Sequence, residues 1–447
     1  MLCQFSFWNY KSFRDETTLD FCPANISEHP DHLIEEPISK EKFLPIAVIY
    51  GPNGGGKTTV LDAFQHLRSR IFRINEIDEP SGELDINVVQ PRKKARRDKT
   101  ISFAFDPQCA DQPTGWSVSF ITEGYEYKYT LVMFAGQITE ESLYAKNLKT
   151  EDVLMLYERK DSIVLGKDLQ GIHVDDVDSS RPLLSLISSF YKQKHILNVA
   201  DWFKRSKGLN YGSNIILENS LLLPEESNPA YKTFFKVLQS MGIEITNIDV
   251  EEDIEGSPVK IYTVYNYNGR KIRLEYSEES SGTQKIFSLL IHLFKSLLAG
   301  TPIFVDELDA KLHPKLLEKL ISLYTDPEIN TNGGQLIFTS HDLYTMDSKF
   351  LRRDEIWFAA RRDDFSSKLY SLAEFRKDGV NNTNGKQPRK DENYSKQYIK
   401  GHYGADPYFQ RIENWMVNHE RKTPKKGRQR TRRQNRPRKN GTKTTQN

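Results

Sequence analysis

Alternating apolar and polar positions predict β structure in much of the first 150 residues. Phenylalanines stand among polar residues in the first fifty, as in half-buried strands. Residues 44–50 form a continuous apolar run that ends at Gly51, which is typical of a strand buried on both faces of a mostly parallel sheet. Residues 101–105, 116–121 and 125–134 alternate between apolar and polar, which predicts an antiparallel meander.

An apolar repeat of three to four residues predicts two helices. In residues 57–71, directly after the predicted buried strand, the apolar positions share one helical face: Val60, Leu61, Phe64, Leu67 and Ile71. Residues 286–298 form the longest apolar stretch, but polar residues interrupt it and it is shorter than the ~20 apolar residues that span a bilayer. We therefore expect a buried helix there. Residues 302–305 and 335–339 have the composition of further buried strands.

Composition indicates a soluble globular protein. The 447 residues are enough for two or three domains, and 28% charged with 37% apolar residues is an ordinary balance. The first residues lack the charged start and apolar run of a secretory signal, and the three cysteines have neither disulfide nor zinc spacing. These features favour a reducing cytoplasm and disfavour a membrane protein.

The net charge of +2 combines two parts of opposite sign. Residues 421–447 contain twelve Lys or Arg and no Asp or Glu, so residues 1–420 carry −10. We expect a disordered basic tail over 410–447. Such a run is often only solvated, and when it has a partner the commonest one is nucleic acid or an acidic protein. Residues 91–99 are a smaller basic patch in a predicted loop.

A phosphate-binding loop follows the first buried strand. The sequence GPNGGGKT over residues 51–58 matches the pattern G-x-x-x-x-G-K-[ST], with a strand before it and a helix after it. Glycines let backbone N–H groups converge on phosphate oxygens, and the helix N-terminus adds partial positive charge. The residues expected at the nucleotide are Asn53, Gly54, Gly55, Gly56, Lys57, Thr58 and Thr59, with Lys57 at the β and γ phosphates. The alternative is a chance glycine-rich turn before a capped helix.

Two acids at the end of a second buried strand are candidates for metal binding and catalysis. Asp306 and Glu307 directly follow residues 302–305. Asp306 can hold Mg²⁺ together with the Thr58 hydroxyl, and Glu307 can act as the general base that polarises an attacking water. Acids after a strand can also serve helix-start electrostatics. Combined with the phosphate loop, they favour Mg²⁺-dependent nucleotide hydrolysis, and the resemblance described next implies that the nucleotide is ATP.

Two further elements complete an order that resembles the ABC-type ATPase head. The sequence SSGTQ over residues 280–284 precedes the helix predicted at 286–298, and His341 follows the strand predicted at 335–339. Taken singly, a Ser-Gly turn is most often a helix cap and a lone histidine is usually structural. The resemblance implies an α/β fold with a mixed sheet, flanking helices and an antiparallel β subdomain.

The same resemblance implies a head-to-tail homodimer or a higher homo-oligomer. In such an assembly, Ser280 and Gly282 of one subunit close on the γ-phosphate held by the other. His341 would contact that γ-phosphate, and Asp309 would lie in the loop that communicates between subunits. For the glutamine that usually links the metal site to the inserted domain, the candidate is Gln137.

Several stretches resemble one bacterial group more closely. They are FSFWNYKSF at 5–13, ESSGT at 279–283, DELDAKLHP at 306–314, RRDEIWF at 352–358 and KGHYGADP at 400–407. The group comprises the AAA/ABC-type ATPases of abortive-infection and anti-phage defence systems. It is similar to RloA and AbiLi, and distantly related to OLD nucleases and to RecF and SMC-type heads.

This resemblance divides the chain into four parts. Residues 1–150 would form the N-terminal lobe of the ATPase domain with the phosphate loop, and 151–270 a globular, mainly helical insertion. Residues 271–409 would form the C-terminal lobe with the SSGTQ signature, the acid pair and the switch histidine. Residues 410–447 would be the basic tail.

Three functions remain open from the sequence. The first is an ATPase that acts as sensor or scaffold of an anti-phage defence system and controls a separately encoded effector, a nuclease or a toxin. The second is a DNA repair or recombination ATPase similar to RecF or SMC proteins, in which ATP-driven dimerisation clamps DNA. The third is a scaffold that binds nucleotide without hydrolysing it.

Overall fold

The computed structural model describes residues 1–72, 101–174, 177–211, 229–252, 258–310, 312–376, 388–389 and 391–405. These residues belong to one compact unit, Met1–Pro407. The basic patch at 91–99 and the basic tail at 410–447 lie outside the described residues. The four-part division therefore stays a prediction.

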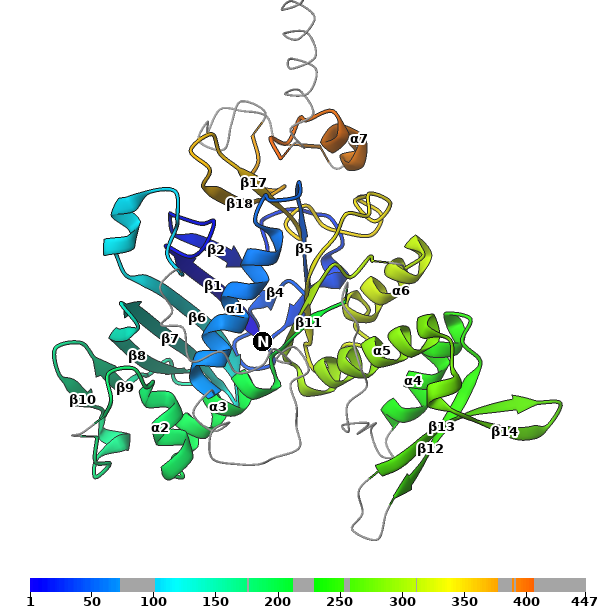
Figure 1. The fold of residues 1–447 in the computed structure, drawn as a ribbon, viewed down its shortest axis with the longest axis horizontal. Helices are drawn as coiled ribbons and strands as arrows, with labels where there is room; N and C mark the ends of the chain where they lie inside the picture. Colours follow the sequence, from blue (N-terminus) through cyan, green and yellow to red (C-terminus); the bar gives the residue numbers. More distant parts are fainter. Residues whose placement is uncertain are drawn as a thin grey trace, which may run out of the picture. The chain divides into compact units, whose positions relative to one another are not determined.

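An antiparallel sheet of seven strands forms one layer (Figure 1). Its order is β10-β9-β8-β7-β6-β1-β2. The strands are β1 (Leu2–Trp8), β2 (Thr17–Asp20), β6 (Thr114–Thr122), β7 (Tyr125–Phe134), β8 (Gln137–Asn147), β9 (Val153–Arg159) and β10 (Ile163–Leu165). The meander predicted from residues 116–121 and 125–134 is confirmed as β6 paired with β7.

A mixed sheet of six strands forms a second layer, in the order β11-β15-β16-β5-β17-β18. Its strands are β11 (Lys207–Asn210), β15 (Pro302–Asp306), β16 (Gln335–Thr339), β5 (Ile46–Tyr50), β17 (Ile356–Arg361) and β18 (Ser367–Ser371). Neighbours from β11 to β17 pair in parallel, and β18 is antiparallel to β17. The three predicted buried strands are confirmed as β5, β15 and β16, every residue of which is buried.

The helices predicted at residues 57–71 and 286–298 are confirmed as α1 and α5, and the described residues form five further helices. The helices are α1 (Lys57–Phe72), α2 (Leu183–Phe190), α3 (Lys194–Arg205), α4 (Pro229–Ser240), α5 (Ser281–Ala299), α6 (Pro314–Thr325) and α7 (Tyr394–Ile399). Short 3₁₀ segments are η1 (Pro30–His32), η3 (Pro107–Asp111), η4 (Lys167–Leu169) and η5 (Tyr276–Glu278). In the part of the chain that the structure describes, no helix combines the length and the apolar character that a bilayer crossing requires.

Two hydrophobic cores flank the mixed sheet. Alternate residues of β5 face opposite sides, because side chains along a strand alternate between faces. Ala47 and Ile49 belong to the core shared with the antiparallel sheet and α1 to α3. Ile46, Val48 and Tyr50 belong to the core shared with α4 to α6. The strand before the phosphate loop is therefore packed against a hydrophobic core on both faces, which fixes the position where the loop begins.

Two small antiparallel sheets complete the fold. One has three strands, β12 (Ile245–Glu252), β13 (Pro258–Tyr267) and β14 (Arg270–Glu275), and the other pairs β3 (Ile34–Glu35) with β4 (Lys42–Phe43). β12 lies against α4, and α4 lies against α5 (Figure 1).

The insertion predicted as mainly helical is mixed. The described part of residues 151–270 divides between α2 to α4 and strands β9 to β13. β9 pairs with β8, and β11 pairs in parallel with β15, almost one hundred residues later in the chain. β11 has only four residues and its partner strand lies in a distant segment, so local periodicity does not reveal it.

The prediction of a strand at residues 101–105 is wrong. This segment is irregular, although Phe103 is buried. The Phe103 N–H donates to Asn9 Oδ1 (3.0 Å), and the Ile101 carbonyl accepts from the Lys11 N–H (2.6 Å). Hydrogen bonds to a side chain and to one turn replace a strand ladder, and of the three alternating apolar residues only Phe103 is buried.

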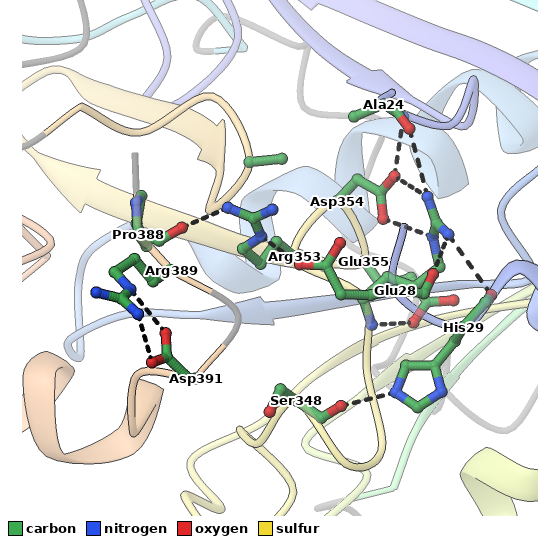
Figure 2. A network of polar contacts seen from close by, with 12 residues as sticks. Ala24, Glu28, His29, Ser348, Arg353, Asp354, Glu355, Pro388, Arg389 and Asp391 are labelled. Carbon is green, nitrogen blue, oxygen red and sulfur yellow. Dashed lines mark hydrogen bonds and ion pairs between the residues drawn. The ribbon is translucent and has the colours of Figure 1, made fainter. Parts of the chain in front are cut away.

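A buried polar network holds the start of β17 (Figure 2). The Arg352 guanidinium, 1% exposed, donates to both carboxylate oxygens of Asp354 at 2.8 and 2.9 Å. Arg353 donates to Glu28 Oε1 at 2.6 Å. The carbonyl of Glu355 then accepts from the N–H of Val48 in β5 (2.8 Å). The network thus joins the residue before β17 to β5, at the end of these strands opposite the phosphate loop.

The stability of the fold is expected to depend on pH through His292 in α5. Burial lowers the pKa of His292 to about 4, and the neighbouring Lys207 and Lys295 act in the same direction. Between pH 6.5 and 4 the unfolded chain takes up a proton that the folded chain does not, so the free energy of unfolding falls as the pH falls. The contribution is about 3 kcal/mol.

Urea denaturation at several pH values checks this expectation. From pH 7 to pH 4 the wild-type protein should lose about 3 kcal/mol more stability than the variant His292→Leu. The variant His402→Leu, which changes an exposed histidine, serves as the control and should follow the wild type. Parallel pH profiles for the wild type and His292→Leu would contradict the expectation.

Candidate functional site

The loop between β5 and α1 requires glycine at defined positions. Gly51 has φ 151° and Gly56 has φ 107°, a backbone region that other residues rarely adopt. A Cβ on Gly51 would lie 2.1 Å from the carbonyl oxygen of Ala359 in β17, and one on Gly56 would lie 2.7 Å from Ser367 Oγ in β18. Close packing against β17 and β18 therefore explains the glycines at these two positions.

Lys57 is the first residue of α1 and is almost completely buried, with 7% exposed. Its Nζ donates to the carbonyl oxygens of Gly51 (2.8 Å) and Pro52 (3.3 Å). Burial lowers the pKa of Lys57, while the nearby carboxylates of Asp306, Asp309 and Glu307 oppose the shift. The ammonium thus stays inside the loop, where it can exchange carbonyl partners for phosphate oxygens.

The end of β15 brings the first acid to the loop. Asp306 is buried, and its Oδ1 accepts from the hydroxyls of Thr58 (3.2 Å) and Thr339 (2.6 Å). Thr339, the last residue of β16, also accepts from the N–H of Glu307 (2.8 Å). A carboxylate and a hydroxyl at this distance are oxygen donors of the kind that Mg²⁺ prefers.

The second acid has an uncommon backbone conformation. Glu307 has φ 53°, in the left-handed region that non-glycine residues seldom occupy. Its side chain is exposed, in contrast to that of Asp306. Such backbone outliers cluster at functional sites. The turn after β15 therefore separates the two carboxylates, one buried at the strand end and one at the solvent side.

His341 lies beyond the end of β16, close to the acid pair. The backbone N–H of His341 donates to Asp309 Oδ2 (3.0 Å). Asp309 Oδ1 is buried without a hydrogen-bond partner among the described residues. Burial lowers the pKa of His341, and the positive charge of Lys57 adds to this effect, whereas the three neighbouring carboxylates oppose it. The imidazole is therefore neutral at pH 7, so it can accept or donate one proton at the site.

These residues enclose a cavity of about 310 Å³. The sequence-predicted residues that line it are Asn53, Gly54, Gly56, Lys57, Thr58, Thr59, Asp306, Glu307 and His341. Gly55 lies behind the lining, where a Cβ would be 2.6 Å from the Ala359 carbonyl oxygen. Asp309 reaches the cavity only through its contact with His341.

Three lining residues escaped the sequence analysis: Ser12, Pro52 and Thr339. Pro52 lies inside the loop pattern at a position that the pattern leaves open. A hydroxyl at the end of a buried strand next to β15 was the one available signal for Thr339. Ser12 belongs to the stretch at 5–13 that carries the family resemblance, but its local sequence does not place it at the loop, which it reaches only through packing of segments distant in sequence.

Ser280 and Gly282 do not line the cavity of their own chain. Ser280 is the N-cap of α5, and its Oγ accepts from the N–H of Thr283 (3.1 Å). Both Ser280 and Gly282 are exposed to solvent. Gln137 lies at the start of β8, also outside the cavity lining, and accepts a hydrogen bond from Ser179. The phosphate loop, acid pair and histidine thus meet within one chain, whereas the signature lies apart.

Comparison with known families agrees with this geometry. A family model described as "AAA domain, putative AbiEii toxin, Type IV TA system" matches residues 46–347, and a model described as "AAA domain" matches residues 6–66. No curated protein matches the chain. The first match covers more than half of the 447 residues and contains every residue of the cavity except Ser12. The chain therefore belongs to this family of AAA-type P-loop ATPases.

Proposed function

We propose that the chain is a Mg²⁺-dependent ATPase of the ABC type that works as a sensor or scaffold in an anti-phage defence system. One observation supports the ATPase activity in this proposal: the same cavity is lined by Lys57, by Thr58 and Asp306 in contact with each other, and by Glu307 and His341. These groups provide phosphate binding, oxygen ligands for a cation and a base, which together suit hydrolysis of a phosphoanhydride.

Each group has a distinct part in the proposed reaction. The loop N–H groups and Lys57 bind the phosphates, and Thr58 with Asp306 would hold Mg²⁺, which when bound neutralises charge on the phosphate oxygens. Glu307, exposed at the cavity, orients the attacking water and accepts its proton. His341, kept neutral by burial and by Lys57, hydrogen-bonds the γ-phosphate.

The proposed active assembly is a head-to-tail dimer. Ser280 and Gly282 are exposed at the start of α5, and neither lines the cavity of its own chain. The N-terminus of a helix carries partial positive charge and N–H donors, so it suits a phosphate presented by another subunit. The ABC-type resemblance implies that this phosphate is the γ-phosphate of the nucleotide bound in the partner's cavity.

The defence role rests on resemblance. The stretches similar to RloA and AbiLi extend from the start of the chain to residue 407. The description of the matching family names a toxin of a type IV toxin–antitoxin system. We infer that nucleotide-driven closure of the dimer controls a separately encoded nuclease or toxin.

Purification of the native operon products with ATP tests this proposal. With the Glu307→Gln variant, the effector should co-purify in defined stoichiometry with a nucleotide-bound dimer. Defence by the isolated chain, without any neighbouring gene, would contradict the control of an effector. Toxicity of the chain expressed alone would assign the toxic action to the chain itself.

A RecF-like or SMC-like ATPase that clamps DNA is the second candidate, favoured by the twelve basic residues of 421–447. Hydrolysis stimulated by DNA and lost at high salt, with no protein partner, would support it. Removal of residues 421–447 should abolish that stimulation. Basal hydrolysis should persist, since every residue that lines the cavity lies before residue 342.

Thr339, which lines the cavity, is expected to support catalysis by holding both acids in position. The variant Thr339→Val removes the hydroxyl that donates to Asp306 and accepts from the Glu307 N–H, so both acids lose a fixed position. We expect kcat to fall about tenfold or more, as for the loss of one buried hydrogen-bonding group. Thr339→Ser keeps the hydroxyl and should retain most activity. Equal activity of the two variants in steady-state assays would refute this role.

A further inference from the structure

The residue before the signature is tied to the three-stranded sheet. The carboxylate of Glu279 precedes the N-cap Ser280, and its Oε1 accepts from the Tyr265 hydroxyl at 2.6 Å. The Thr263 hydroxyl donates to the same oxygen. Both hydroxyls come from β13, the central strand of the sheet β12-β13-β14. Hydrogen bonds to a charged group are about twice as strong as neutral ones, so this contact fixes Glu279 to the sheet.

A second set of contacts joins the segment after β14 to the first turn of α5. The Tyr276 hydroxyl donates to the carbonyl oxygen of Gln284 (2.8 Å). In return, Gln284 Nε2 donates to the carbonyl oxygens of Tyr276 (2.9 Å) and Ser277 (3.3 Å). The glutamine side chain of the SSGTQ signature is thus used within its own chain, where it binds η5 to the start of α5.

The sheet itself is anchored in the core. Thr263 is fully buried, and Ile261 and Tyr265, on the same face of β13, pack against the core that contains α4 and α5. β13 pairs with both neighbours, in register Thr263 with Ile248 and Thr263 with Leu274. A displacement of β13 would therefore be transmitted to Glu279, and from there to the adjacent Ser280.

We propose that Tyr265, Thr263 and Glu279 are positioning residues that set the orientation of Ser280 and Gly282 toward the nucleotide of a partner subunit. This inference rests on the proposed ATPase function and on its head-to-tail dimer. The sheet β12 to β14 then serves as the support of the signature. Since the signature acts on the other subunit, loss of this support lowers turnover in the assembly and leaves ATP binding by the chain's own loop unchanged.

The variant Tyr265→Phe tests the proposal, with Tyr262→Phe as matched control. Both remove one hydroxyl from β13, but Tyr262 lies on the opposite face and donates to Glu251 (3.2 Å) instead. We expect kcat of Tyr265→Phe to fall about tenfold, with the Kd for ATP within about twofold of wild type. Tyr262→Phe should match the wild type in both. Glu279→Gln keeps an acceptor oxygen and should retain more activity than Glu279→Ala.

A mixing experiment separates positioning from a general structural defect. Tyr265→Phe subunits are combined with excess Glu307→Gln subunits, which have an intact signature, and single-turnover hydrolysis is measured. In the mixed dimer the loop of Tyr265→Phe faces that intact signature, so its rate should approach the rate of wild-type subunits in the same excess. A persisting tenfold difference would place the defect inside the Tyr265→Phe chain and overturn the proposal.

The outcomes also separate this inference from the proposed function. If Glu307→Gln abolishes turnover while Tyr265→Phe and Tyr262→Phe behave alike, the ATPase assignment stands and the positioning role falls. If Glu307→Gln hydrolyses ATP at the wild-type rate, the assignment of the catalytic site falls, and the role of Tyr265 falls with it.

Discussion

The variant Glu307→Gln is expected to bind ATP normally and to hydrolyse it at least about 100-fold more slowly than the wild type, the usual effect of losing a general base. The side chain lines the cavity and is exposed, whereas the oxygen donors for a cation belong to Thr58 and Asp306. The substitution therefore removes a base and leaves phosphate and metal binding in place. Nucleotide should accumulate in a stable dimer.

Phosphate release and size-exclusion chromatography with multi-angle light scattering check this expectation. The dimeric fraction should increase with ATP for Glu307→Gln and should return to monomer when EDTA is added. Glu328→Gln, an exposed acid outside the cavity lining, is the control for the loss of one negative charge. Turnover of Glu307→Gln within a factor of two of the wild type would show that another group acts as base.

The variant Lys57→Ala is expected to lose ATP binding, with an increase in Kd of about 100-fold, corresponding to roughly 2.7 kcal/mol. Lys57 is the one cation that lines the cavity among the described residues, so its loss leaves the phosphate charges without a direct ammonium partner. Hydrolysis and ATP-dependent dimerisation should disappear together. Isothermal titration with ATP and Mg²⁺ measures the affinity.

The fold should tolerate this substitution. Burial lowers the pKa of Lys57, so the folded state disfavours its charge, and removal of the charge offsets part of the packing that is lost. Lys368→Ala is the matched control, because burial also lowers the pKa of that lysine and it lies outside the cavity lining. Normal ATP binding by Lys57→Ala would refute the whole site assignment.

Local spacing was sufficient for the parts of the site that are contiguous in sequence. The loop at residues 51–58 needs glycines, a lysine and a threonine at set intervals, because the backbone itself binds phosphate. The acid pair after β15 likewise follows directly from a buried strand that ends in Asp306 and Glu307. For both, the pattern lies in consecutive residues, so a single sequence reveals it without knowledge of the tertiary structure.

Contacts between distant segments were beyond the reach of local patterns. Thr339 meets Asp306 across 33 residues, and Ser12 approaches the loop from the segment after β1. β11 pairs with β15 although its own four residues have little strand character. Periodicity describes which side of an element is apolar, but it does not say which element will cover that side.

By itself, the sequence determined the phosphate loop, its flanking strand and helix, and the acid pair, because each of these is encoded by a few consecutive residues. It also determined the α/β class, through the order of the predicted strands and helices along the chain. Only the tertiary structure decided that Thr339 joins the two acids and that Glu279 is held by Tyr265 and Thr263. It also decided that Ser280 and Gly282 lie apart from the cavity of their own chain. These contacts depend on strand order and register, which result from packing of the whole domain rather than from local spacing.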